Sequence, residues 1–100
     1  MGFYGEQAER GGYVYFAQAG SPAGDPIKIG WSTNPSCRVR EMNCWYPFGD
    51  LRVCRTFRGT KRDEKALHEK FAHLRMRGEW FRPEPELCDF INAIGREAAA

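Results

Sequence analysis

The 100-residue sequence lacks several features that would place it in a special class of protein. It has no run of about 18 apolar residues, so we expect no membrane-spanning helix. No basic region followed by an apolar one stands near its start, so we expect no secretion signal and a cytoplasmic protein. It has no CxxC pair, which indicates reduced, partly buried thiols rather than a zinc site at Cys37, Cys44, Cys54 and Cys88.

What is present fits one small folded domain. Hydrophobic residues make up 42% of the chain and aromatic residues 14%, enough for a single modest core. We expect a loose lead-in over residues 1–11, one domain over residues 12–95 and a tail over residues 96–100. At this length we expect no separate sequence-reading domain. Any target choice would therefore come from a protein partner, a homodimer or the structure of the target.

The charge of the chain is concentrated in its middle. The whole chain carries +2, but from Arg38 to Arg77 eleven lysines and arginines stand against five acidic residues, a net +6. A basic segment of this kind suits a phosphate backbone, although charge runs are often only solvated faces. The arginines expected to contact nucleic acid are Arg40, Arg55, Arg58, Arg75 and Arg77.

Local patterns predict the element order ββαβαα. Aromatic and β-branched runs indicate strands, and Asn34-Pro35 and Thr60 with Asp63 indicate helix starts. The expected strands are residues 13–16, 27–31 and 51–57, and the expected helices are residues 35–42, 61–75 and about 87–94.

The helix expected over residues 61–75 is the most informative element. Its apolar stripe, at i, i+4 and i+7, comprises Leu67, Phe71 and Leu74. At about 100° per residue, Glu64, His68 and Arg75 lie on one flank of that stripe. The helix therefore offers a half-buried edge with a carboxylate, an imidazole and a guanidinium.

Several short motifs together resemble the GIY-YIG nucleases. Val14-Tyr15 and Ile29-Gly30 resemble the second halves of the GIY and YIG elements. Arg38 follows Gly30 by eight residues and precedes Val39, which is similar to the G-x7-R-V pattern of that superfamily. Over residues 12–83 the chain resembles the phage T5-type branch, with the pattern YVYF…IKIG…R…E..LH..F…R..GEWF.

This resemblance implies a fold and a chemistry. The fold would be α/β (α+β), with a small three-stranded antiparallel sheet flanked by helices. The activity would be metal-dependent hydrolysis of DNA phosphodiester bonds, with one Mg²⁺ or Mn²⁺ held by Glu64 and water. Arg38 would contact the phosphate, Tyr15 would orient or deprotonate the attacking water, and Lys28 would assist the tyrosine or touch phosphate. His68 is a further candidate for the site.

Other interpretations of these residues stay open. The alternatives are strand packing for Tyr15, a surface position for Arg38, a helix-dipole interaction for Glu64 and a hydrogen-bonded, half-buried position for His68. Arg75 and Glu79 are expected to form a structural pair.

The function likewise has alternatives. The superfamily's second tyrosine is Lys28 here, and an asparagine that often follows the acidic helix has no obvious equivalent. These departures allow a catalytically inactive nucleic-acid-binding module on the same scaffold, with RNA as an alternative partner to DNA. A third interpretation is a protein-interaction domain that uses the aromatic side chains of Trp45, Tyr46 and Phe48.

Overall fold

The computed structural model describes residues 11–20, 24–47 and 50–94. Apart from Gly11, the predicted lead-in and the tail lie outside these residues, as does Phe48. The strands are β1 (Tyr13–Gln18), β2 (Ile27–Ser32), β3 (Arg52–Arg58), β4 (Arg75–Arg77) and β5 (Trp80–Phe81). The helices are α2 (Pro35–Asn43), α3 (Lys61–Lys70), the 3-10 turn η1 (Ala72–Leu74) and α4 (Pro85–Ala93). No helix in these described ranges has both the length and the apolar character needed to cross a membrane.

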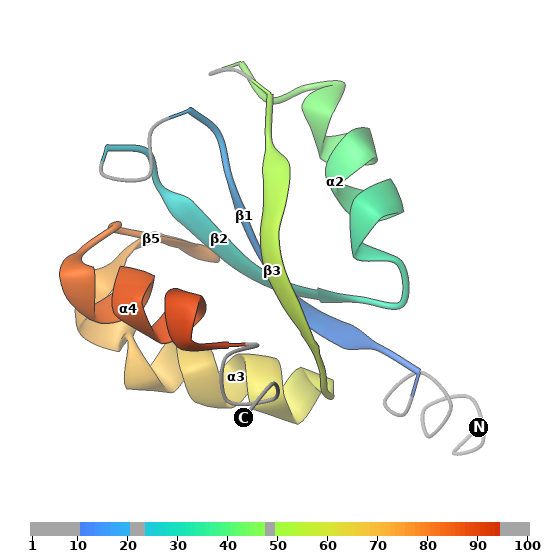
Figure 1. Ribbon diagram of the computed structural model, residues 1–100. Coiled ribbons are helices and arrows are strands. Elements are labelled where there is room, and N and C mark those ends of the chain that lie inside the picture. The colour runs from blue at the N-terminus through green and yellow to red at the C-terminus, as the bar shows by residue number, and fades with distance from the viewer. Residues whose placement is uncertain (1–10, 21–23, 48–49, 95–100) are drawn as a thin grey trace.

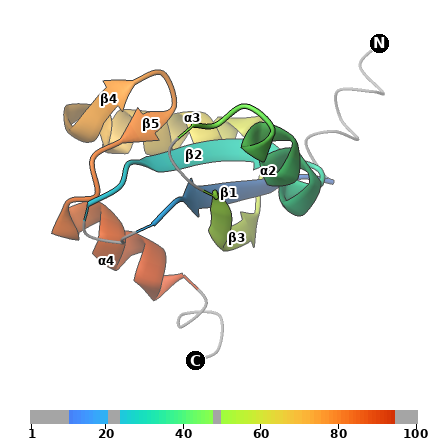
Figure 2. The same cartoon turned by 90° about the horizontal axis from the view of Figure 1, so that it is seen from above.

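The strands form one sheet in the order β3-β1-β2-β5-β4, with every neighbouring pair antiparallel. The mixed, antiparallel fold class is as predicted, but the prediction of three strands is wrong. Figure 2 shows β3 and the β4–β5 hairpin on opposite sides of the β1–β2 pair. The two extra strands are short, and β5 pairs with β2 only at Ile27 and Lys28. Most of that edge of β2 is therefore left to α3.

Side-chain alternation along β1 divides the core into two clusters, one on each face of the sheet. Val14 and Phe16 pack with side chains from β2, α3 and α4, whereas Tyr15 and Ala17 pack with Val39 and other side chains of the α2 face. Figure 1 shows the same division, with α3 and α4 together on one side of the sheet and α2 on the other. We call the side that carries Tyr15 the α2 face.

Both predicted helix starts are confirmed. The Asn34 side chain accepts a hydrogen bond from the Cys37 amide, and Pro35 occupies the first turn of α2. Thr60 and Asp63 form a capping box at the start of α3. These caps fix where Arg38 and Glu64 stand, since each lies within the first turns of its helix.

The helix predicted over residues 61–75 ends earlier, at Lys70. Phe71 leaves the helical conformation (φ −106°, ψ 24°), and the 3-10 turn still directs Leu74 into the core. The chain then forms the β4–β5 hairpin, whose turn contains Gly78 with φ at +56°, a conformation that glycine adopts without strain. Arg75 is thus an exposed strand residue with its guanidinium over the Phe81 ring, and the helical position predicted for it is wrong.

Candidate functional site

Tyr15 lies at the centre of the α2 face. Its ring is 1% exposed, and it stands opposite Gly30 in the β1–β2 register. An added Cβ at residue 30 would lie 2.5 Å from the tyrosine Cζ and 2.6 Å from its hydroxyl oxygen. The hydroxyl contacts the Met42 sulfur at 3.9 Å. Glycine in β2 therefore makes the space in which the phenol lies.

Lys28 stands two residues before Gly30 and so shares its face of β2. Its ammonium pairs with the Glu79 carboxylate, which comes from the turn of the β4–β5 hairpin. The backbone carbonyl of Glu79 also accepts a hydrogen bond from the Ile29 amide at 3.0 Å, which fixes the hairpin against β2. The structural pair predicted between Arg75 and Glu79 is wrong, because Glu79 pairs with Lys28.

Arg38 reaches the same place from α2. Its charge and a side-chain hydrogen bond both act on the Tyr15 hydroxyl, and both favour the ionised form of the phenol. Its guanidinium also lies 3.7 Å from the Glu41 carboxylate one turn along the helix. The Arg38 side chain is 58% exposed, so this guanidinium is accessible to an anionic ligand.

Glu64 and His68 come from α3, which lies along the open part of the β2 edge. The two side chains face each other at 3.8 Å and are 16% and 15% exposed. The His68 Nε2 lies 2.9 Å from the Ile29 carbonyl oxygen. Because a carbonyl only accepts, Nε2 must carry the proton and donate it, which leaves Nδ1 for other partners. His68 is therefore held against the β2 backbone, with Glu64 beside it.

The electrostatics of the cluster show that its groups act on one another. Burial raises the pKa of Tyr15 to about 12, with further increase from Glu79 and Glu64 and opposition from Arg38. Burial also raises the pKa of Glu64, and the neighbouring Glu79 carboxylate adds to the shift while His68, Lys28 and Lys61 oppose it. Side chains from β1, β2, α2, α3 and the β4–β5 turn thus converge on one site.

The donor set fits a hard cation bound by few protein ligands. In the described part of the chain no group of three or more His, Cys, Asp or Glu is placed to hold a metal, so a closed protein cage is absent there. Glu64 and Glu79 nevertheless present two carboxylates that repel each other, and a bound divalent cation would relieve this repulsion. Mg²⁺ commonly binds through one or two carboxylates and keeps several waters.

Comparison with known proteins assigns the chain to a family. The T5orf172 domain model matches residues 12–95, which is most of the chain. The chain belongs to the T5orf172 domain family. This domain is phage-associated, in agreement with the predicted phage relationship. No curated protein and no solved structure shows a significant match to the chain.

The arginines predicted to bind nucleic acid are spread over this T5orf172 domain. Arg55 and Arg58 lie on β3, at one edge of the sheet, and Arg75 and Arg77 lie on β4, at the other. Arg40 is exposed on α2. All five are exposed, but the two edge pairs are separated by three strands and do not form one continuous patch.

The residue that sequence analysis missed as part of the site is Glu79. It is the only member of the cluster that comes from the hairpin, and it acts on Tyr15, Glu64 and Lys28. The available signal was Gly78, because a glycine between two short runs marks a hairpin turn that brings its neighbours back to the sheet.

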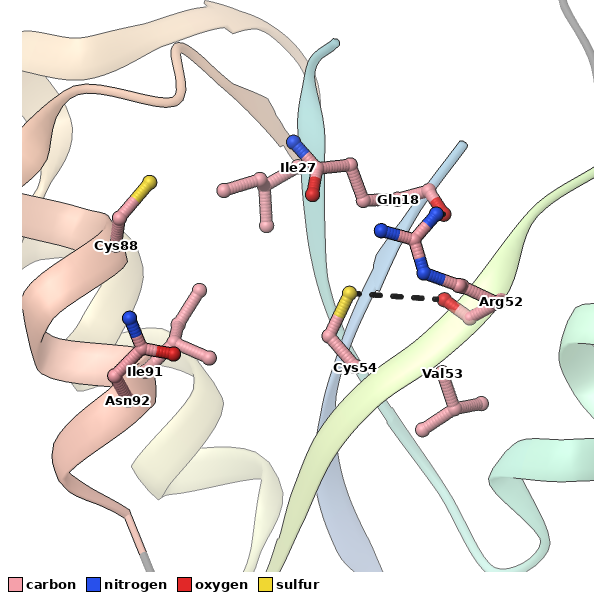
Figure 3. A pocket seen from close by; sticks show the side chains of 8 residues that line it. All are labelled: Gln18, Ile27, Arg52, Val53, Cys54, Cys88, Ile91 and Asn92. Carbon is pink, nitrogen blue, oxygen red and sulfur yellow. Dashed lines mark hydrogen bonds between the residues drawn. The ribbon is translucent and has the colours of Figure 1, made fainter. Parts of the chain in front are cut away.

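Apart from the candidate site, the T5orf172 domain has a cavity of about 300 Å³ between β3 and α4 (Figure 3). Figure 3 shows Cys54 and Cys88 among its lining side chains, and these two thiols pack against the core cluster on the side of the sheet opposite Tyr15. Burial raises the pKa of both thiols, which keeps them protonated and weakly nucleophilic. All four cysteines are free thiols, so the expectation of reduced cysteines is consistent with the structure.

Proposed function

We propose that this T5orf172 domain is a metal-dependent endonuclease of the GIY-YIG type that hydrolyses DNA phosphodiester bonds. The observation that carries the proposal is the convergence of Tyr15, Arg38, Glu64 and Lys28, from four separate elements, on one site beside β2. A phenol, a guanidinium and a carboxylate are the groups that such hydrolysis requires. They orient water, bind the phosphate and hold a cation.

Each side chain has a task that suits its surroundings. Arg38, exposed and next to Tyr15, binds a non-bridging phosphate oxygen and stabilises the charge that develops there. Tyr15, with a pKa of about 12, stays protonated at neutral pH, so its hydroxyl orients the attacking water instead of acting as a preformed base. Lys28 stays close enough to Glu64 to favour the ionised carboxylate.

Glu64 would hold the metal. Its carboxylate is largely buried beside the Glu79 carboxylate, and its pKa is raised. A charged group in such surroundings does not stabilise the fold, and perturbed groups of this kind are typical of binding sites. A bound Mg²⁺ or Mn²⁺ supplies charge stabilisation for the leaving oxygen.

A supercoiled-plasmid nicking assay with Mg²⁺ or Mn²⁺ tests this proposal. The wild-type protein is expected to nick the plasmid, and Tyr15→Phe, Arg38→Ala and Glu64→Gln are expected to lose roughly 10²- to 10⁴-fold in rate. Glu69→Gln, an exposed glutamate on the same helix, is the matched control and is expected to keep the wild-type rate. An inactive wild-type protein under all these conditions would overturn the proposal.

A second candidate is a nucleic-acid-binding module without cleavage. The specific observation in its favour is the Lys28–Glu79 pair, which occupies the position next to Tyr15 where the superfamily has its second tyrosine. Salt-sensitive DNA binding by a wild-type protein that never cleaves would support this candidate over the first.

A further inference from the structure

Beside the candidate site lies an open hollow of about 450 Å³ with a mainly apolar lining. We call it the aromatic hollow, and its lining residues are Asp25, Pro26, Tyr46, Met76, Arg77 and Trp80. Its volume falls in the range of pockets that hold small organic groups. Met76, one of these residues, is 54% exposed, so its side chain is accessible to a ligand in the hollow.

The walls of the hollow are suited to a flat aromatic ligand. The Tyr46 and Trp80 rings are stacked, with centroids 5.4 Å apart and planes 19° from parallel. Aromatic side chains favour offset-stacked contacts with other flat rings, and thioether sulfur also packs well against aromatic groups. At the rim, Asp25 offers a carboxylate acceptor and the exposed Arg77 a cation. A nucleobase presents the matching chemistry, with two flat faces, amino donors at its edge and an attached phosphate.

The hollow adjoins the candidate site at Trp80, which lies next to Lys28. Trp80 pairs with Lys28 across β2 and β5, so both side chains lie on the α2 face with Tyr15. The Lys28 ammonium lies 5.9 Å from the centre of a Trp80 ring while it pairs with Glu79. A strand whose phosphate is held at Arg38 would thus bring a neighbouring nucleotide to the Trp80 side of Lys28.

We propose that the aromatic hollow binds one unstacked base next to the phosphate held at the site, so that the domain selects single-stranded or locally unpaired DNA over regular duplex. This inference rests on the proposed nuclease function and adds its substrate class. Stacking on aromatic side chains is the usual way in which proteins hold single strands, and it is unavailable to a base inside a duplex.

The test measures binding separately from cleavage. The Glu64→Gln background is used with Mg²⁺ present, and fluorescence anisotropy compares a labelled single-stranded oligonucleotide with its fully paired duplex. The single strand is expected to bind more tightly. Adding Tyr46→Ala or Met76→Glu is expected to weaken single-strand binding roughly 5- to 100-fold and to change duplex binding less than about twofold.

Two matched controls show whether the effect is specific to the hollow. Trp45→Ala removes a neighbouring aromatic side chain that is 66% exposed and does not line the hollow, and it should leave both affinities unchanged. Asn92→Glu adds the same negative charge as Met76→Glu, but places it on α4, which lies on the side of the sheet opposite α2. Met76 is exposed, so Met76→Glu tests the hollow even where Tyr46→Ala disturbs folding.

The outcomes separate the two proposals. Equal affinity for single strand and duplex, or equal weakening of both by the hollow variants, would overturn the inference even if the wild type nicks plasmid. If the hollow variants selectively lose single-strand binding but the wild type never cleaves, the base-binding proposal is supported and the nuclease proposal is contradicted.

Discussion

The phenol of Tyr15 occupies the space that any side chain at residue 30 would need, because a Cβ there would lie 2.6 Å from the tyrosine hydroxyl oxygen. The two residues are direct partners in the β1–β2 register. The glycine of the IKIG run is therefore part of the site, since it lets the hydroxyl reach the face shared by Arg38 and Lys28.

Gly30→Ala is expected to displace the Tyr15 ring. Overpacking of a buried site costs about 1–3 kcal/mol in free energy of unfolding, and the misplaced hydroxyl should also reduce nicking at least tenfold. Urea denaturation measures the first effect and plasmid nicking the second. Gly24→Ala is the control, because an added Cβ there meets nothing within 4 Å. Similar behaviour of the two variants would contradict the account of Gly30.

Tyr15→Phe keeps the ring and removes only the hydroxyl, which contacts the Met42 sulfur and the Arg38 side chain. The folded state of the wild type favours the protonated phenol, because the pKa of Tyr15 is raised from 10.0 to about 12. That contribution to stability is complete below pH 10 and is lost as pH rises through 12. The wild type should therefore lose more stability than Tyr15→Phe over this window, as thermal unfolding at stepped pH would show. Parallel curves would argue against a buried, protonated Tyr15.

Glu64→Gln is expected to raise stability while it abolishes cleavage. Burial raises the pKa of Glu64, so its contribution to stability is present below its ordinary value of 4.5 and is lost as pH rises through the folded-state pKa. At neutral pH, without metal, the amide should therefore unfold at a higher temperature than the wild type. The matched Glu69→Gln should not. Equal or lower stability of Glu64→Gln would contradict the stated cause of the shift.

Added Mg²⁺ or Mn²⁺ should stabilise the wild type and leave Glu64→Gln unchanged. A ligand that binds only the folded state raises stability by about 2.7 kcal/mol at one hundred times its dissociation constant. A thermal melt with and without metal measures this. An equal metal shift in both proteins would place the cation elsewhere.

Substitutions of Lys28 and Glu79 should have non-additive effects on the free energy of unfolding. Lys28→Met leaves the Glu79 carboxylate beside Glu64 without its partner, whereas Lys28→Met with Glu79→Gln removes both charges. Since the Glu79 side chain is 45% exposed, we expect a coupling energy on the order of 1 kcal/mol from a double-mutant cycle. Additive effects of the two substitutions would show that the pair is not energetically linked.

Much of the fold was predictable because its signals are local. A run of aromatic and β-branched residues marks β1, alternating apolar residues mark β2, and the caps at Asn34 and Thr60 mark the starts of α2 and α3. These elements carry Tyr15, Lys28, Arg38 and Glu64, so most of the candidate site could be named from the sequence.

The remainder depends on long-range pairing, which the sequence pattern does not report. Leu74 follows the apolar spacing of an α-helix, so the helix was predicted to continue past it. In the structure a 3-10 turn directs Leu74 into the core, and the α-helix ends earlier. The two-residue strand β5 is stabilised by the open edge of β2, far away in sequence. The contact of Glu79 with Lys28 and the stacking of Tyr46 on Trp80 both follow from that pairing; Gly78 marks the hairpin turn in the sequence, but not the strand against which the hairpin packs.

The most direct test of the central claim is the rate of plasmid nicking as Mg²⁺ or Mn²⁺ is titrated, for the wild type and for Glu64→Gln. The account predicts metal-dependent nicking by the wild type and roughly 10²- to 10⁴-fold slower nicking by a folded Glu64→Gln protein. Nicking by Glu64→Gln at the wild-type rate, or no nicking by the wild type at any metal concentration, would contradict it.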